Sequence, residues 1–465
     1  MARRALWLLW LLPLLVPLLF HNPYWVHGVF CRVLVYAILV ASLDLLVGYV
    51  GDVSIGHAGF FAIGAYAVAA LTAPPSLNSD SSLAAFAQWP PWAAFIPAVL
   101  LAAAAGLVLG FPSLRSSGPY LAVITIAYGL IIGTVINESE SLTNGTRGIT
   151  LAPPRLGGLS LSGGYFVWVA YPALLLTFWL VRNLTRSFRG RALEALKYSA
   201  VAAECCGVSR ATSKVTAFVL SAALAGFAGG LFVQLDAYVG PTTFSYSFSV
   251  MLLIALIFGG VRSLWGNVLG AAVVVVLPDV FSQFADYRLM VYGSLLLVVL
   301  FLLPGGLAGA LAAPLRRWRK VDLLAQGEEL AQASAGIDPL GPAAAGGDAD
   351  ALRLESVTMR FGGLTVIDGL SMRLEPGRVL GLIGPNGSGK STTVNLLSGV
   401  YFPAGGRIAL FGHDVTRLVA HRRAARGLAR TFQNLQLFGG LTVLENVLVG
   451  LHLSFRSRLW EVLLG

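Results

Sequence analysis

One short run carries residue types that bind phosphate: Gly384-Pro385-Asn386-Gly387-Ser388-Gly389-Lys390-Ser391. Its glycines followed by lysine and serine fit the phosphate-binding loop, whose backbone N–H groups turn toward phosphate oxygens. In such a loop the lysine reaches the β and γ phosphates, and the hydroxyl of Ser391 coordinates Mg²⁺. The run therefore predicts a site for a nucleoside triphosphate and its metal ion.

The segments on either side of this loop are the elements that must position it. Residues 379–383 are apolar and predict a buried strand, whereas residues 392–397 predict the first turns of a helix. A helix that begins at the loop adds a dipole favourable to phosphate. Farther upstream, a strand is expected from residue 352, a turn at Gly362-Gly363, and another strand at 371–374. This strand–loop–helix setting supports the nucleotide-site interpretation.

Two residues outside the loop are further candidates for the nucleotide site. Phe361 comes before the loop and is suited to stack on adenine, although a single aromatic residue there is also typical of a core. Gln433 follows in the run Arg430-Thr431-Phe432-Gln433. A glutamine at this separation from the loop suggests a segment that senses the γ-phosphate and the metal.

Composition assigns most of the chain to a lipid environment. The 465 residues are 56% hydrophobic and 12% charged, against about 25% charged in soluble domains. A membrane span needs about 20 apolar residues. Because two of the apolar segments, 247–261 and 290–303, are short, we expect eight to ten spans before residue 315. The segments lie near 5–20, 29–50, 53–72, 92–111, 119–136, 165–182, 215–235, 247–261, 267–282 and 290–303.

The basic residues favour one orientation. Alternate threading places most of them on one side and leaves only Arg147, Arg155 and Arg288 in the opposite loops. The positive-inside rule puts the basic side in the cytoplasm, and the phosphate loop falls on that side, where ATP is found. The net charge of +10 follows from this bias, so we expect no nucleic-acid partner. Residues 5–20 are expected to remain as the first helix, because no cleavage site follows them.

Several membrane residues have two interpretations that the sequence leaves open. Asp44, Asp52 and His57 are ionisable groups in or near spans, where function is the default expectation. Alternatively, Asp52 lies at the interface and His57 makes an interhelical hydrogen bond. Small residues recur at 56–64 and 225–230, which suits either tight helix packing or a helix break along a path. Three cysteines make no disulfide framework, and Cys205 and Cys206 are expected to be reduced thiols.

These motifs resemble two subunits of one ABC importer, the branched-chain amino acid type. Its ATP-binding subunit is similar to residues 383–393, 430–433 and 441–446, and its permease to residues 48–66, 120–123 and 259–266. Residues 190–207 resemble the family's coupling segment, and helix formers with Gly207 at a C-cap position fit that comparison. An ordinary amphipathic loop helix is the alternative.

The resemblance implies an architecture and roles for residues. It implies an α-helical polytopic membrane domain at 1–315, a flexible linker at 316–350, and the first part of an α/β ABC ATPase domain at 351–465. ATP and Mg²⁺ are the implied cofactors. Phe361 would stack on adenine, Gly384 to Thr392 would hold the triphosphate, and Ser391 with Gln433 would contact the metal.

The same resemblance implies an importer of the bacterial cytoplasmic (inner) membrane. A second permease, a second ATPase and an external solute-binding protein would be its partners, within the lipid bilayer. The implied cargo is a branched-chain amino acid, with urea, short amides and other amino acids left open. The alternatives are an ATP-regulated membrane protein, a permease whose nucleotide domain binds ATP without hydrolysing it, and a membrane-tethered kinase.

The 465 residues depart from the family after Gln433. No Leu-Ser-Gly-Gly-Gln signature, no strand ending in Asp-Glu and no late histidine follows it. Since the glutamate normally orients the attacking water, we expect this chain to bind ATP weakly without hydrolysing it at its own site. No catalytic residue is assigned, and whether the chain is an enzyme stays open. A clipped gene or record explains the pattern more simply than a designed half-domain.

Overall fold

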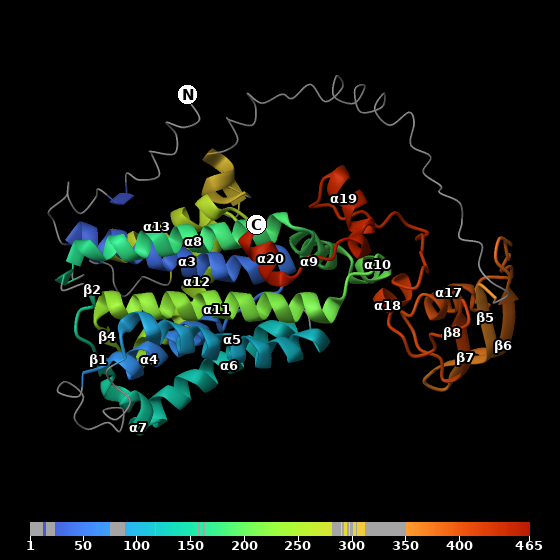
Figure 1. Cartoon of the computed structure of the whole chain (residues 1–465), viewed down its shortest axis with the longest axis horizontal. Coiled ribbons are helices and arrows are strands. Elements are labelled where there is room, and N and C mark those ends of the chain that lie inside the picture. The colour runs from blue at the N-terminus through green and yellow to red at the C-terminus, as the bar shows by residue number, and fades with distance from the viewer. Residues whose placement is uncertain are drawn as a thin grey trace, which may run out of the picture. The chain divides into compact units, whose positions relative to one another are not determined.

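The structure is a computed structural model, and contacts divide it into two compact units (Figure 1). The first holds the described residues of Met1–Lys197, Ala211–Leu315 and Ser457–Gly465, and the second those of Tyr198–Arg210 and Arg316–Arg456. The residues described are 13–14, 24–74, 89–116, 118–156, 159–160, 163–280, several between 290 and 311, and 350–465.

The first unit is built of apolar helices. Five of its described helical stretches are long and apolar enough to cross a membrane, and three shorter ones are equally apolar. Seven main helices are α3 (Arg32–Asp44), α4 (His57–Thr72), α5 (Pro91–Arg115), α6 (Pro119–Glu138), α8 (Val167–Arg186), α11 (Arg210–Asp236) and α12 (Tyr246–Gly259). The unit also contains η2 (Tyr24–Cys31), η3 (Leu45–Val50), α9 (Phe188–Tyr198), α13 (Leu264–Val280) and α20 (Leu459–Leu464).

These helices confirm the predicted spans from residue 29 to residue 280, with small changes of boundary. Apolar length predicts them well because a helix satisfies its own backbone hydrogen bonds in lipid. The predicted spans at 5–20 and 290–303 lie mostly outside the described residues, so the expected total of eight to ten stays a prediction.

One predicted span, 53–72, is wrong in its first turn. Residues 51–56 are unwound between η3 and α4, and Gly51 has a φ of 82°, the left-handed region that glycine tolerates. At Gly56 this segment approaches the backbone of α6 closely. A Cβ atom on residue 56 would collide with the carbonyl oxygen of Thr125 in α6. The break therefore sits where two backbones touch.

Helix α3 lies at the centre of the unit. Its residues from Val33 to Asp44 are all buried, and α8, α12 and α13 pack around it. Helices α4 and α11 approach closely through Gly64 and Gly226, where any side chain on Gly64 would meet the Gly226 backbone. The close-packing interpretation of these small residues is thereby confirmed.

Short elements connect the helices at the end of the unit away from α9 (Figure 1). The strand β1 pairs antiparallel with β4, and β2 pairs with β3. The elements are α7 (Glu140–Thr143), η6 (Gly145–Arg147), β1 (Ile149–Thr150), β2 (Arg155–Leu156), β3 (Leu159–Ser160), η7 (Gly163–Phe166), β4 (Tyr238–Val239) and η8 (Pro241–Phe244).

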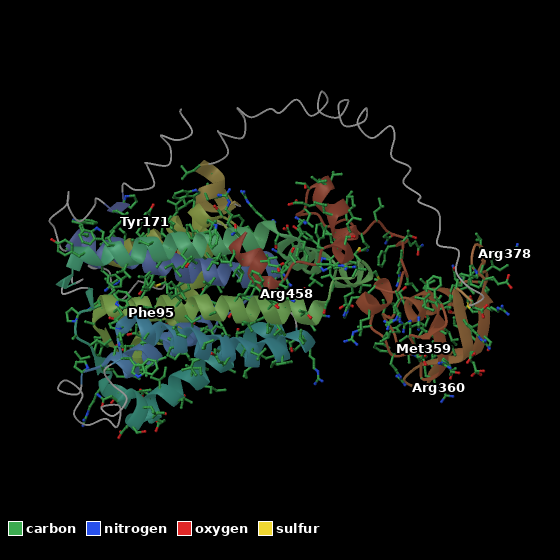
Figure 2. All side chains as sticks on the ribbon, in the orientation of Figure 1. Phe95, Tyr171, Met359, Arg360, Arg378 and Arg458 are labelled. Atoms are coloured by element: carbon green, nitrogen blue, oxygen red, sulfur yellow. The ribbon has the colours of Figure 1, made fainter. Side chains whose placement is uncertain are left out.

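The second unit is an antiparallel sheet with short helices. The strand order is β6-β5-β7-β8, and the turn between β5 and β6 falls at Gly362 and Gly363, as predicted. Side chains alternate along β5, so Met359 is buried and Arg360 is exposed (Figure 2). The elements are α10 (Ala200–Cys205), β5 (Leu352–Phe361), β6 (Leu364–Leu374), α17 (Lys390–Leu397), β7 (Gly405–Leu410), β8 (His413–Asp414), α18 (Ala420–Ala424), α19 (Val443–Gly450) and η10 (His452–Ser454).

The buried strand predicted at 379–383 is wrong. This segment is irregular and pairs with none of the described strands, and Val379 and Ile383 are 100% and 93% exposed. A strand needs hydrogen-bonding neighbours, and an apolar run needs a covering layer. The described part of the unit supplies neither at this position.

Candidate functional site

The phosphate loop curls around the ammonium group of Lys390. Gly387 and Gly389 have φ values of 85° and 87°, and Gly389 is the N-cap of α17. Lys390 Nζ donates to the carbonyl oxygens of Gly384 and Pro385, both at 2.6 Å. The loop and the start of the helix are thus arranged as the sequence predicts.

This loop is chemically suited to an anion. Residues 384–388 are exposed, and the N-terminus of α17 presents backbone N–H groups with a favourable dipole. The bonds of Lys390 to the loop's own carbonyls are of the kind that phosphate oxygens replace with stronger, charge-assisted ones. Binding of a triphosphate would therefore release this lysine from the loop.

An aromatic pair stands at the end of β5. Phe361 is 43% exposed, and its ring meets the ring of Tyr401 edge-on, with centroids 5.3 Å apart. Tyr401 comes after α17 and was not identified from the sequence, because a pair of residues 40 positions apart leaves no local signal. The partly exposed face of Phe361 keeps the adenine-stacking role as a prediction.

The role of Gln433 as a metal contact stays a prediction. Gln433 and Ser391 are both exposed, and no hydrogen bond among the described residues joins them. Arg430 lies with its guanidinium over the ring of Phe432, 4.7 Å from its centroid. Thr392, the last residue assigned to the site, follows Ser391 in the first turn of α17 and is half-buried.

Arg423 supports the loop from the far end of α17. Its side chain is fully buried, and it donates to the carbonyl oxygens of Leu396 and Leu397, at 2.5 and 2.9 Å, and of Leu418, at 2.8 Å. Burial lowers the pKa of this guanidinium to about 10. The sequence does not identify Arg423 as a buried residue, because Arg422 and Arg423 are adjacent and nothing local distinguishes them.

The segment resembling a coupling element, 190–207, forms two helices: most of α9, in the first unit, and α10, in the second. Ser199 caps α10 by accepting a hydrogen bond from the Ala202 N–H, at 3.3 Å, and α10 packs against α18. Gly207 follows the helix with a φ of 89°. The one short helix that the sequence predicts is thus two helices, and the glycine stop after the second is confirmed.

The thiols of Cys205 and Cys206 are free, as predicted. Burial raises the pKa of Cys205, and the Arg430 guanidinium partly offsets that rise. Arg430 stands three residues before Gln433, so α10 and the glutamine segment belong to one neighbourhood of the second unit.

An ionic cluster joins α9 to the helices of the first unit. The guanidinium of Arg262 makes a bidentate pair with Glu194, at 2.5 and 2.6 Å. The backbone N–H of Arg262 donates to the carboxylate of Asp44, at 2.9 Å. One turn along α9, Lys197 Nζ donates to the Gly48 carbonyl at 2.8 Å, and burial lowers the pKa of this lysine. Helix α9 is therefore fastened at both Glu194 and Lys197.

Asp52 and His57 both have partners inside the first unit. Asp52 is buried and pairs with Lys214, at 2.8 Å. His57 Nε2 lies 2.8 Å from the hydroxyl of Ser42, which is the interhelical hydrogen bond, while its Nδ1 has no partner among the described residues. Lys214 and Ser42 are distant in the sequence from Asp52 and His57. The sequence therefore identifies the ionisable residues but not their partners.

A family model described as the permease component of the branched-chain amino acid transport system matches residues 26–300. The chain belongs to this permease family. A second model, that of ABC transporters, matches residues 367–464. The chain is thus a multi-pass membrane permease fused to an ABC-type ATP-binding domain, and the resemblance noted in the sequence is confirmed.

Individual relatives agree with both halves. The permease protein LivM of the high-affinity branched-chain amino acid transport system of Escherichia coli K12 is 33% identical over 299 residues, 59% of this chain and 68% of LivM. The ATP-binding protein BraF of Pseudomonas aeruginosa is 46% identical over 101 residues, 22% of this chain and 40% of BraF. LivG of E. coli K12 is 41% identical over 113 residues, 24% of this chain and 44% of LivG. The ATP-binding part of this chain thus covers less than half the length of BraF and of LivG.

Proposed function

We propose that this chain imports branched-chain amino acids across the bacterial cytoplasmic membrane, using ATP bound by its second domain. The observation that carries the proposal is the joining, in one chain, of a permease similar to LivM and a domain similar to LivG and BraF. Two subunit types that serve one transport system are here physically linked.

The proposed division of the chain is a permease at 1–315, a linker at 316–350 and an ATP-binding domain from 351. In that domain, Gly384 to Thr392 hold the triphosphate, with Lys390 released from its own loop carbonyls toward the phosphates. Phe361 stacks on adenine, and Ser391 with Gln433 binds Mg²⁺. Ser391 and Gln433 are both exposed, so both side chains are open to the ion.

The proposed complex contains a second permease, a second ATPase and an external solute-binding protein. Helix α9 supports this assignment, because a helix fastened by Glu194 and Lys197 to Arg262 and Gly48 passes movement to the core of the permease. A loosely attached loop helix would not transmit force in this way.

The test is uptake of labelled leucine by proteoliposomes that contain the assembled complex, with and without the solute-binding protein. We expect uptake that requires both ATP and the binding protein, and that unlabelled isoleucine and valine inhibit while urea and acetamide do not. Inhibition of uptake by urea but not by isoleucine or valine would assign urea as the cargo instead. Nucleotide binding without any uptake would favour the ATP-regulated membrane protein instead.

A further inference from the structure

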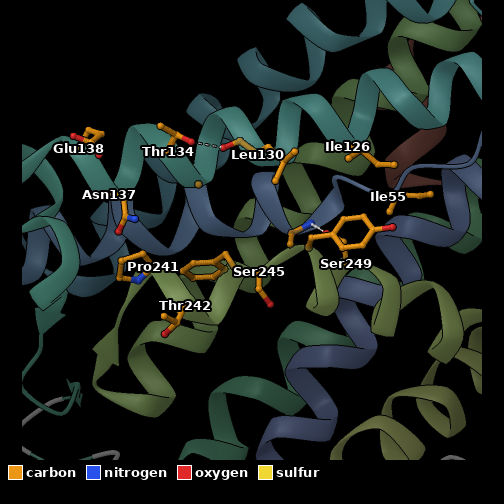
Figure 3. Close-up of a pocket in the computed structure, with 15 residues that line it drawn as sticks. Ile55, Ile126, Leu130, Thr134, Asn137, Glu138, Pro241, Thr242, Ser245 and Ser249 are labelled. Atoms are coloured by element: carbon orange, nitrogen blue, oxygen red, sulfur yellow. Dashed lines mark hydrogen bonds between the residues drawn. The ribbon is translucent and has the colours of Figure 1, made fainter. Parts of the chain in front are cut away.

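A cavity of about 410 Å³ opens in the first unit between α4, α6 and α12 (Figure 3). Its volume is within the range of small-molecule sites, about 300–1,000 Å³. Asn137 and Glu138 line one end, at the C-terminal end of α6, and Ile55, Ala58 and Ser249 line the other, beside the helix break.

The polar lining of this cavity is unexpected in an apolar helix. Thr134, Asn137 and Glu138 lie along the exposed side of α6 and all border the cavity. Polar and charged groups that face lipid are costly, and in membrane proteins they usually border water-filled cavities or substrate paths. This strip of α6 is therefore better suited to a passage than to the bilayer.

The two ends of the cavity offer opposite chemistry. Glu138 places a carboxylate where α6 ends, which is also the negative end of its dipole. At the other end α4 begins, and the N–H of Ala58 donates to the buried hydroxyl of Ser249, at 3.2 Å. Among the described residues no acceptor takes the Ser249 proton, so this hydroxyl is available as a donor.

The distance between the ends limits what one ligand can do. Gly129, near the break, and Glu138 are nine residues apart on α6, which corresponds to about 13 Å at about 1.5 Å per residue. One amino acid cannot span that length, so the two ends would act in succession. The rest of the wall combines apolar side chains, among them Leu130 and Phe244, with the hydroxyl of Thr134.

We propose that this cavity is the chain's share of the substrate path for a zwitterionic amino acid with an apolar side chain. Glu138 receives the ammonium group at the entrance. Ser249 and the start of α4 receive the carboxylate at the inner end, as broken helices do for anionic groups in other transporters. The proposal rests on the proposed function and names the residues through which that function operates.

Gly133 offers a direct way to block the path. It borders the cavity, and a Cβ atom added there would meet no atom within 4 Å. Gly133→Phe should therefore fill the passage without displacing backbone, and we expect leucine uptake to fall at least about 10-fold while nucleotide binding and thermal unfolding stay unchanged. Ile131→Phe, on the same helix but outside the cavity, is the matched control.

A second variant tests the entrance and does not depend on the first. Glu138→Gln should raise the KM for leucine about 10-fold, the usual loss for a charge-assisted hydrogen bond, with Vmax little changed. Glu140→Gln, an exposed neighbour outside the cavity, should leave KM unaltered. Wild-type uptake by Gly133→Phe together with an unchanged KM in Glu138→Gln would overturn the inference. If the wild-type complex itself fails to take up leucine, the proposed function fails instead.

Discussion

Arg423 and Lys390, two cationic residues of the second unit, differ in burial, and we expect them to differ in role. Arg423 is fully buried and directs its donors at carbonyl oxygens around the end of α17. Lys390, at the beginning of the same helix, bonds only to its own exposed loop. A ligand can replace the partners of Lys390, whereas Arg423 is enclosed by the carbonyl oxygens that it binds.

Replacing Arg423 by leucine should loosen α17. The change removes charge-assisted hydrogen bonds to the carbonyl oxygens of Leu397 and Leu418, worth about 1.5–3 kcal/mol each, so we expect a loss of about 3 kcal/mol in the unfolding free energy of this region. Hydrogen–deuterium exchange of residues 390–397 in the full chain should become faster. Arg422→Leu, at an exposed position, should leave exchange unchanged. Equal protection in both variants would contradict the assigned role.

Among the elements, α4 and α11 depend on the absence of side chains where they touch. We expect Gly64→Val to lower the thermal midpoint of the detergent-solubilised chain, because its side chain would meet the Gly226 backbone and overpacking costs about 1–3 kcal/mol. Gly133→Val, at an open position, is the stability control. A midpoint unchanged by Gly64→Val would show that the helices are not held at this contact.

Helix α9 is held in place by an ion pair, whereas α4 and α11 are held by close packing at glycines. Removing the charge of the buried Glu194, which pairs with the more exposed Arg262, by Glu194→Gln should lower the coupling of ATP to leucine uptake. The exchanged pair, Glu194→Arg with Arg262→Glu, should restore part of the uptake lost in Glu194→Gln. Full activity in the single variant would mean that this ion pair does not serve transmission.

Across the whole molecule, the sequence predicts features whose cause is local. Apolar length identified the spans from 29 to 280, and the glycine–lysine–serine spacing identified the loop before α17. Features decided by distant partners were missed. The segment 379–383 has strand composition without a neighbouring strand, the break before His57 follows from a contact with α6, and Tyr401 meets Phe361 only through folding.

The central claim is that ATP bound at the phosphate loop of this chain is needed for transport through its permease. The most direct measurement is ATP-dependent leucine uptake by proteoliposomes containing the complex with Lys390→Ala, compared with Arg378→Ala, an exposed basic residue of the same domain. Loss of the lysine removes the charge that reaches the β and γ phosphates, so we predict at least about a 10-fold fall in uptake for Lys390→Ala and none for the control. Undiminished uptake by Lys390→Ala would contradict the claim.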